Sequence, residues 1–317
     1  MDDDALLGRY LSAGWWAEQE ARHPMDRQML YWQLTMPEYE EGKKRLIHAL
    51  EILENVLAAD PLAGRKRNEF AGKFRDDDEQ ADVVAELREL VFLSQHTSNI
   101  VYAPTYPDKK GPDFRCDPVS RPIEVEVTNL SGTEGERKSK GLRDQLDKQL
   151  YDVPSGCRFS IGVLSIRTQQ DLISTFRSIK EWLKKQPKEG EHDLPNGLRI
   201  RVWETNFDPE HTLVQYRSWS GSGVQDRDEQ ILRKVRRKAG QLSGLCPGLI
   251  VTDVELEYNT SFADTIHSKS GQSVFRLHPQ ISAVILVSHV KGMHPRSLFP
   301  NTWASHPLES DEIDRLI

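Results

Sequence analysis

Two nearly continuous apolar runs, at residues 159–166 and 281–288, constrain the fold more than any other part of this sequence. Both are rich in β-branched residues, and both are far shorter than the roughly 20 apolar residues that a membrane-spanning helix needs. Such runs are typical of strands at the centre of a sheet that is covered on both faces. They predict a mixed α/β fold in which helices pack against a sheet.

Shorter patterns around these runs divide the 317-residue chain into two predicted parts. Residues 1–75 carry apolar side chains at helical spacing, which predicts a helical N-terminal region. Residues 76–317 alternate β-branched segments with helical patterns, which predicts one α/β domain with surface loops at 187–197 and 218–228. Strands are predicted at 100–103, 113–116, 123–128, 159–166, 198–204, 248–253 and 281–289, and helices at 81–95, 138–151, 169–186 and 227–243.

Composition and missing motifs exclude several classes of protein. The net charge of -7 argues against a uniformly basic nucleic-acid coat. The widely spaced Cys116, Cys157 and Cys246 predict reduced thiols rather than disulfides or a zinc ribbon. The acidic start lacks the features of a secretory signal, so a cytoplasmic protein without a membrane partner is expected. Motifs of phosphate loops, zinc proteases, serine hydrolases and dinucleotide-binding folds are missing.

An acidic pair lies on the predicted strand at 123–128. Because side chains alternate along a strand, Glu124, Glu126 and Thr128 share one face, opposite an apolar face. An ordinary amphipathic edge strand gives the same pattern. Asp113 on the preceding short strand favours a site, because a turn between the strands allows an antiparallel pairing that brings Asp113 beside the pair. Like charges at such close range repel unless a cation lies between them.

The helix predicted at 81–95 supplies a further acid. On a helical projection Glu86 falls within the apolar arc, whereas Glu89 falls on the opposite side. An acid directed toward a packed surface needs a cation, a backbone donor or a metal as its partner. Glu86 is therefore predicted to face the packed side with such a partner, and Glu89 is predicted to be a surface residue.

A strand with Pro-Asp, a turn, and a strand with an acid between β-branched residues together resemble the PD-(D/E)XK nuclease superfamily, which has the restriction-endonuclease-like fold. The resemblance covers residues 81–166, where a helix, Asp113, Glu126, a second helix and an apolar strand follow in the family's order. It implies a mixed sheet flanked by helices. It also implies that Asp113 and Glu126 bind Mg²⁺, with Mn²⁺ as a substitute, and that Glu86 supports the site.

The sequence departs from this family at the lysine that orients or polarises the attacking water. The position two residues after the strand acid is Thr128 if Glu126 is the acid, and it is Glu126 itself if Glu124 is the acid. Two residues could take the role of the missing lysine. One is Glu124, and the other is a lysine that has moved to a neighbouring or later helix. The lysines considered are Lys138, Lys140, Lys148 and Lys238.

Basic residues on two predicted helices are candidates for contact with nucleic-acid phosphates. A solvated helix face explains a basic run such as 231–240 equally well. The candidate contacts are Lys138, Lys140, Arg143, Lys148, Arg233, Arg236, Arg237 and Lys238.

The sequence therefore predicts a Mg²⁺-dependent nuclease that hydrolyses phosphodiester bonds in DNA, with RNA as the alternative substrate. A role in prokaryotic defence or restriction, as a homodimer or with a partner protein, is expected by analogy of fold. Because the motif lysine is missing, the main alternative is an inactive nuclease fold that binds nucleic acid or a partner protein. A helical interaction protein with a purely structural α/β region is a third interpretation.

Overall fold

The computed structural model divides the chain into two compact units. The first unit comprises Met1–Ala21, Gln28–Ser131 and Arg227–Ile317, and the second comprises Arg22–Arg27 and Gly132–Asp226. The residues that the structure describes are 2–24, 27–76, 79–119, 121–130, 134–164, 166, 168–194, 197–206, 208–219, 224–254, 266, 268–288 and 295–317. Within these ranges, no helix has the length and apolar character needed to cross a membrane.

The first unit begins with a group of helices that includes the predicted N-terminal helical region. Leu50, Leu53 and Leu57 recur at helical spacing in α4 and are fully buried, which stabilises the helix by removing apolar surface from water. The predicted boundary between residues 75 and 76 lies between α5 and α6, which belong to the same unit. The helices are α1 (Asp3–Tyr10), α2 (Ala13–Ala21), α3 (Met29–Thr35), the 3-10 helix η2 (Pro37–Tyr39), α4 (Glu40–Leu57), α5 (Ala63–Arg75) and α6 (Gln80–His96).

A mixed sheet in the order β1-β2-β3-β8-β9-β10 forms the centre of the first unit. β1, β2 and β3 pair antiparallel, β3, β8 and β9 pair parallel, and β10 pairs antiparallel with β9. Every residue of β3, β8 and β9 is buried, which confirms the covered strand predicted at 281–288. The bounds are β1 (Ser98–Tyr102), β2 (Phe114–Asp117), β3 (Ile123–Asn129), β8 (Gly248–Val254), β9 (Ala283–Ser288) and β10 (Arg296–Pro300), followed by α12 (Ser310–Leu316).

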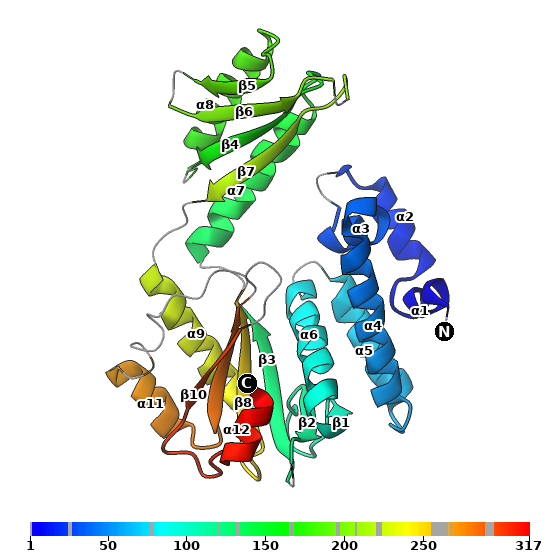
Figure 1. The fold of residues 1–317 in the computed structure, drawn as a ribbon, viewed down its shortest axis with the longest axis vertical. Coiled ribbons are helices and arrows are strands. Elements are labelled where there is room, and N and C mark those ends of the chain that lie inside the picture. Colours follow the sequence, from blue (N-terminus) through cyan, green and yellow to red (C-terminus); the bar gives the residue numbers. More distant parts are fainter. Residues whose placement is uncertain are drawn as a thin grey trace. The chain divides into compact units, whose positions relative to one another are not determined.

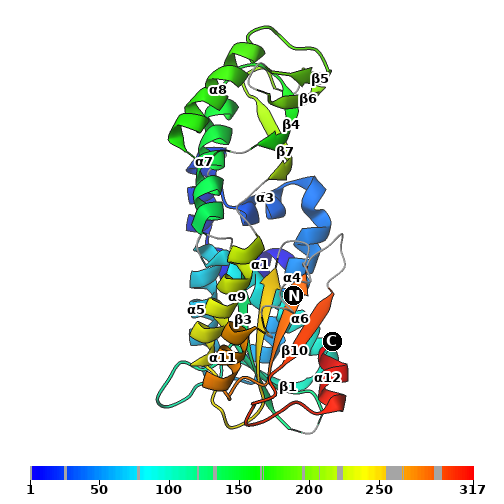
Figure 2. The same cartoon turned by 90° about the vertical axis from the view of Figure 1, so that its left-hand side faces the viewer.

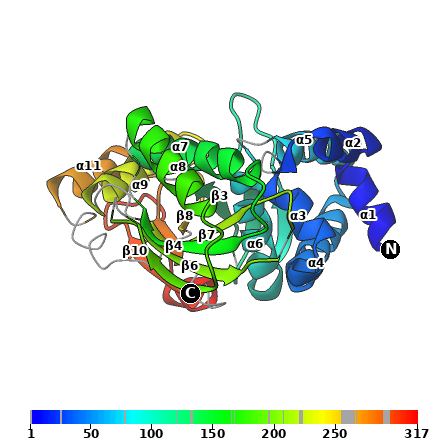
Figure 3. The ribbon, with the colours of Figure 1, turned by 90° about the horizontal axis from the view of Figure 1, so that it is seen from above.

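Helices cover both faces of this sheet (Figures 1 and 3). α6 packs against the face that carries Val125 and Val127, and α4 and α5 lie beyond α6. α9 (Val224–Ala239) and α11 (Lys269–Leu277) pack against the other face, which carries Ile250. Because Ile250 is the register partner of Glu126, the polar face of β3 is turned toward α9. The predicted mixed α/β class is confirmed.

The second unit is built around a smaller sheet in the order β5-β6-β4-β7. Its core joins Leu146 of α7 and Ile179 of α8 to the strand residues Phe159, Ile200 and Val202. Figure 2 shows α7 and α8 along one face of this sheet. The bounds are α7 (Glu134–Tyr151), β4 (Arg158–Leu164), α8 (Gln169–Leu183), β5 (Gly190–Asp193), β6 (Arg199–Glu204) and β7 (Leu213–Trp219).

The structure corrects the expectation that residues 81–166 form one continuous core. The predicted helix at 138–151 and the apolar run at 159–166 are formed, as α7 and β4, but both belong to the second unit. The strand next to β3 is β8 instead. Periodicity identifies elements but not their partners, because a local pattern does not specify which strands pair. The sequence patterns also miss β7, β10 and β5, the last of which lies in the predicted loop 187–197.

Candidate active site

Asp113 lies immediately before β2, where the ladder between β2 and β3 stops. The register pairs Arg115 with Glu124, and its continuation sets Asp113 opposite Glu126, on the same face. The backbone N–H of Val127 donates to Asp113 Oδ2 at 2.8 Å, in place of the ladder bond that β2 no longer supplies. The predicted antiparallel pairing is therefore confirmed, and it fixes the carboxylate of Asp113 at the edge of β3.

Glu126 is completely buried on the side of β3 that faces α9. Lys238 Nζ, from the last turn of α9, donates a hydrogen bond to Glu126 Oε1. The other oxygen, Oε2, is buried and has no hydrogen-bond partner among the described residues. A buried carboxylate oxygen without a donor is energetically unfavourable, so a cation or a donor would be stabilised at this atom.

Burial and mutual repulsion disturb the titration of these groups. Burial raises the pKa of Glu126 above its ordinary value, and the neighbouring Asp113 raises it further. Burial by itself lowers the pKa of Lys238, but Asp113 and Glu126 raise it above its ordinary value, so Lys238 stays protonated. Lys238 therefore brings one positive charge to the two acids.

Glu86 of α6 lies near Asp113, and its burial agrees with its place in the apolar arc. It is buried, with Tyr102 OH donating to Oε2 at 3.1 Å and Lys73 Nζ lying 3.5 Å from Oε1. Burial raises the pKa of Glu86, and the charge of Asp113 raises it further. Sequence reasoning missed Lys73 and Tyr102, because nothing in the patterns of α5 or β1 distinguishes them from their neighbours.

Glu89 is buried, which corrects its predicted position on the surface. The guanidinium of Arg296 donates two hydrogen bonds to its carboxylate, at 2.8 and 2.9 Å, and stacks 3.7 Å from the ring centre of Phe92. Arg296 also donates to the Leu316 carbonyl of α12. The helical projection fails here because it assumes one packed face, whereas α6 is covered both by the sheet and by elements near the C-terminus.

Glu124 lies on the same strand face as Glu126, but both of its oxygens are already occupied. Tyr106 OH donates to Oε1, and the backbone N–H of Ser243 donates to Oε2. These contacts tie the segment before β2 and the segment after α9 to the centre of the sheet. They favour a structural role for Glu124 and leave Lys238 as the lysine in contact with the strand acid.

Thr128 lies further along the same strand face, in register with Thr252 of β8. In the part of the chain that the structure describes, both hydroxyls are buried without a hydrogen-bond partner. The N–H of the adjacent Asn129 donates to Asp82 Oδ1 at 2.8 Å. Asp82 thus joins the site from the first turn of α6, where its only sequence signal is the general preference of acids for helix N-termini.

The basic candidates fall into separate groups. Lys238 contacts Glu126. The other candidates on α9 are exposed, and they are Arg233, Arg236 and Arg237. Arg143 and Lys148 lie on α7 and belong to the second unit. The side chains of Lys138 and Lys140 lie outside the described residues.

The acids suit a small divalent cation that is shared with a substrate. Mg²⁺ uses one or two carboxylates and completes its shell with waters and substrate phosphates, and Asp113 with Oε2 of Glu126 offers such donors. Among the described residues, no group of three or more His, Cys, Asp or Glu side chains is arranged to hold a metal.

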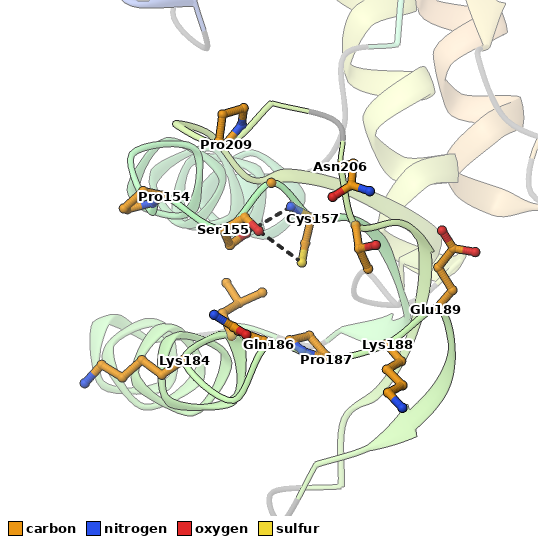
Figure 4. Close-up of a pocket in the computed structure, with 13 residues that line it drawn as sticks. Pro154, Ser155, Cys157, Lys184, Gln186, Pro187, Lys188, Glu189, Asn206 and Pro209 are labelled. Atoms are coloured by element: carbon orange, nitrogen blue, oxygen red, sulfur yellow. Dashed lines mark hydrogen bonds between the residues drawn. The ribbon is translucent and has the colours of Figure 1, made fainter.

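A groove of about 960 Å³ lies within the second unit and is lined by none of the predicted catalytic residues (Figure 4). The Cys157 N–H donates to Ser155 Oγ at 3.1 Å. Burial raises the pKa of Cys157, so this thiol lacks the activation that a nucleophile needs. Cys157, Cys116 and Cys246 are free of disulfides, and the last is only partly buried.

Comparisons with known proteins found no matching family model, no matching curated protein and no matching solved structure.

Proposed function

We propose that this chain is a Mg²⁺-dependent nuclease that hydrolyses phosphodiester bonds in DNA. The observation that carries the proposal is the buried carboxylate of Glu126, with Oε1 bound by Lys238 and Oε2 without a hydrogen-bond partner among the described residues. Asp113 supplies a second acid close enough to raise the pKa of Glu126 beyond the effect of burial. Such buried like charges destabilise a protein, so their presence here favours a functional role.

The order of the surrounding elements supports a restriction-endonuclease-like core. α6, β1, β2, β3, α9 and β8 follow one another along the chain, with the second unit inserted between β3 and α9. The first three strands pair antiparallel, and β3 pairs parallel with β8. The sequence resemblance to the PD-(D/E)XK superfamily rests on α7 and β4 following β3, whereas in the first unit α9 and β8 occupy those places. A role in prokaryotic defence is the wider proposal, and it follows from analogy of fold alone.

The residues of the site have the roles that their contacts allow. Asp113 and Glu126 would hold the metal, which would polarise the phosphodiester and lower the pKa of a bound water. Lys238 balances the charge of Glu126 and substitutes for the lysine that the family has at the position of Thr128. Glu86 supports the site from α6, and the exposed arginines of α9 are available to bind substrate phosphates.

The proposal is tested by incubating the full chain with plasmid, linear duplex DNA, single-stranded DNA and RNA, in Mg²⁺ or Mn²⁺. We expect DNA cleavage that stops when the metal is chelated and that is lost in Asp113→Ala and in Glu126→Ala. Cleavage that persists in both variants would reject this site. Binding without cleavage in either metal would favour the inactive nuclease fold.

A further inference from the structure

Two threonine hydroxyls lie among the apolar side chains that face α9 in the first unit. One belongs to Thr252 of β8, which lies between Ile250 and Val254 on the strand face that forms the core beneath α9. A valine has the same shape and buries no hydroxyl. The hydroxyl of Thr252 therefore needs a partner that offsets the cost of its burial.

No protein group described in the structure supplies that partner. Thr252 and its register partner Thr128 of β3 are both fully buried, and neither hydroxyl has a hydrogen bond among the described residues. The large majority of buried polar side-chain atoms bond to the protein or to ordered water. Two such hydroxyls in register on adjacent strands point to a bound water or ligand beside them.

A third buried oxygen without a partner, Oε2 of Glu126, lies on the same strand face. Thr128 follows Glu126 by two residues, about 6.6 Å along the strand, and it lies about 4.8 Å across the sheet from Thr252. A carboxylate oxygen can bind a cation, whereas a hydroxyl both donates and accepts hydrogen bonds. The three atoms therefore combine one ligand for a cation with two groups that can bind its water.

A hydrated divalent cation fits this set better than a neutral water. Asp113 is held at the edge of β3 by the Val127 N–H, so it adds a second negative charge beside Glu126, which a cation offsets and a lone water does not. Mg²⁺ keeps several of its waters when one or two carboxylates bind it. A metal-bound water has two hydrogens to donate, and the two threonine hydroxyls offer the oxygens to accept them.

We propose that Thr128 and Thr252 together hold one water of a Mg²⁺ ion bound at Oε2 of Glu126. The inference rests on the metal site of the proposed function and adds to it the residues that orient the hydration shell. Both threonines are positioning residues, because they act through the water rather than on the metal. Loss of groups that hydrogen-bond to metal ligands typically lowers metal affinity about 10- to 100-fold, so each hydroxyl should contribute measurably to metal binding.

The test measures Mn²⁺ binding to the full chain without nucleic acid, from the electron paramagnetic resonance signal of free Mn²⁺. We expect Thr128→Val and Thr252→Val each to weaken binding about tenfold. The double variant should bind only slightly more weakly than either single variant, because both hydroxyls hold the same water. Thr252→Ser, which keeps the hydroxyl, should bind Mn²⁺ nearly as tightly as the wild type.

Thr212→Val is the matched control. Thr212 is also buried, but it belongs to the second unit and donates to the Val153 carbonyl at 2.7 Å, so its valine variant should bind Mn²⁺ as the wild type does. The inference is overturned if the valine variants of Thr128 and Thr252 bind as tightly as this control, or if their effects multiply in the double variant.

The same titration separates this inference from the proposed function. If Glu126→Ala loses Mn²⁺ while the threonine variants bind normally, the inference fails and the metal site stands. If the threonine variants bind weakly but the wild type cleaves no DNA, the inference stands and the nuclease fails. A wild type that binds no Mn²⁺ would reject both.

Discussion

The contact between Lys238 and Glu126 joins residues that are 112 positions apart in the sequence. Burial lowers the pKa of Lys238 less than Asp113 and Glu126 raise it, so the lysine brings a permanent positive charge to the acids. The sequence leaves four lysines open as replacements for the missing motif lysine. Only the folded chain distinguishes Lys238, because its partner is set by the packing of α9 against β3 rather than by any local pattern.

Replacing Lys238 by Met should lower the rate of Mg²⁺-dependent DNA cleavage about 10²- to 10³-fold, because the site loses a preorganised charge where negative charge develops. Lys234→Met is the control. Lys234 lies one turn earlier on α9 and donates to the Asn129 carbonyl. Single-turnover cleavage of a labelled duplex measures both variants. Equal rates for Lys238→Met and Lys234→Met would show that the Lys238 ammonium has no special role.

Glu86 and Glu89 of α6 show how much local spacing can predict about a single residue. Periodicity places Glu86 on the packed side correctly, because that face meets the sheet. The same projection places Glu89 in solvent, and this is wrong because Arg296, more than 200 residues later in the chain, covers it. The spacing of apolar residues therefore predicts which face of a helix packs on the sheet. It does not predict a second buried face that a distant segment of the chain covers.

At the scale of elements, strand alternation predicts that Glu124 and Glu126 share a face, and both are buried on the side of β3 toward α9. Strand alternation does not predict that the two glutamates have different hydrogen-bond partners. Glu124 is bound by Tyr106 and Ser243, which come from the segments flanking the site. The partner of a strand residue is supplied by other elements, so one strand pattern can hold both a structural acid and a candidate metal ligand.

The start of β8 packs too closely for any side chain, which gives a second prediction. A Cβ at Gly248 would lie 2.5 Å from the Gln280 carbonyl oxygen and 2.8 Å from Leu242. Gly248→Ala should therefore lower the free energy of unfolding by about 2 kcal/mol through overpacking. Gly42→Ala, in an open position of α4, should raise it by about 0.5–1 kcal/mol. Urea unfolding measures both changes, and a destabilisation of equal size in the two variants would contradict this packing.

At the scale of the whole molecule, the mixed α/β class is predictable from the apolar runs, whereas the division into units is not. Residues 132–226 lie in the second unit and interrupt the first between β3 and α9. The inserted helices and strands have the same periodicities as those of the first unit. A reading along the chain therefore assigns α7 and β4 to the first sheet, although the long-range pairing of β3 is with β8.

The N-terminal helices of the first unit are joined by one acid, and this makes their stability depend on pH. Glu54 of α4 accepts hydrogen bonds from Arg67 at 2.7 and 2.8 Å, from Arg9 at 2.8 Å and from Tyr10 at 2.7 Å. Burial raises the pKa of Glu54, but Arg67 and Tyr10 outweigh this effect and hold it below its ordinary value. The stabilisation is therefore complete above the unfolded-state pKa of about 4.3 and is lost as the pH falls through the folded-state value.

Glu54→Gln should lower the free energy of unfolding by about 2 kcal/mol at pH 7, because the partly exposed Arg67 and the exposed Arg9 lose their charged partner. The difference between wild type and variant should shrink below about pH 4. Urea unfolding followed by circular dichroism at a series of pH values measures this difference. A gap that stays constant down to pH 3 would show that Glu54 is not the titrating group.

The central claim, a metal-dependent cleavage site at Asp113 and Glu126, is tested most directly by exchanging one carboxylate oxygen for an amide on each of two neighbouring acids. The measurement is the rate of Mg²⁺-dependent DNA cleavage by Glu126→Gln and by Glu124→Gln, prepared in parallel. We predict that Glu126→Gln loses at least about 10²-fold in rate, because an amide is a poor ligand for Mg²⁺. Glu124→Gln should stay within about tenfold of wild type, because Gln can still contact Tyr106 and Ser243. Equal loss in both variants, or cleavage by Glu126→Gln at the wild-type rate, would contradict the account.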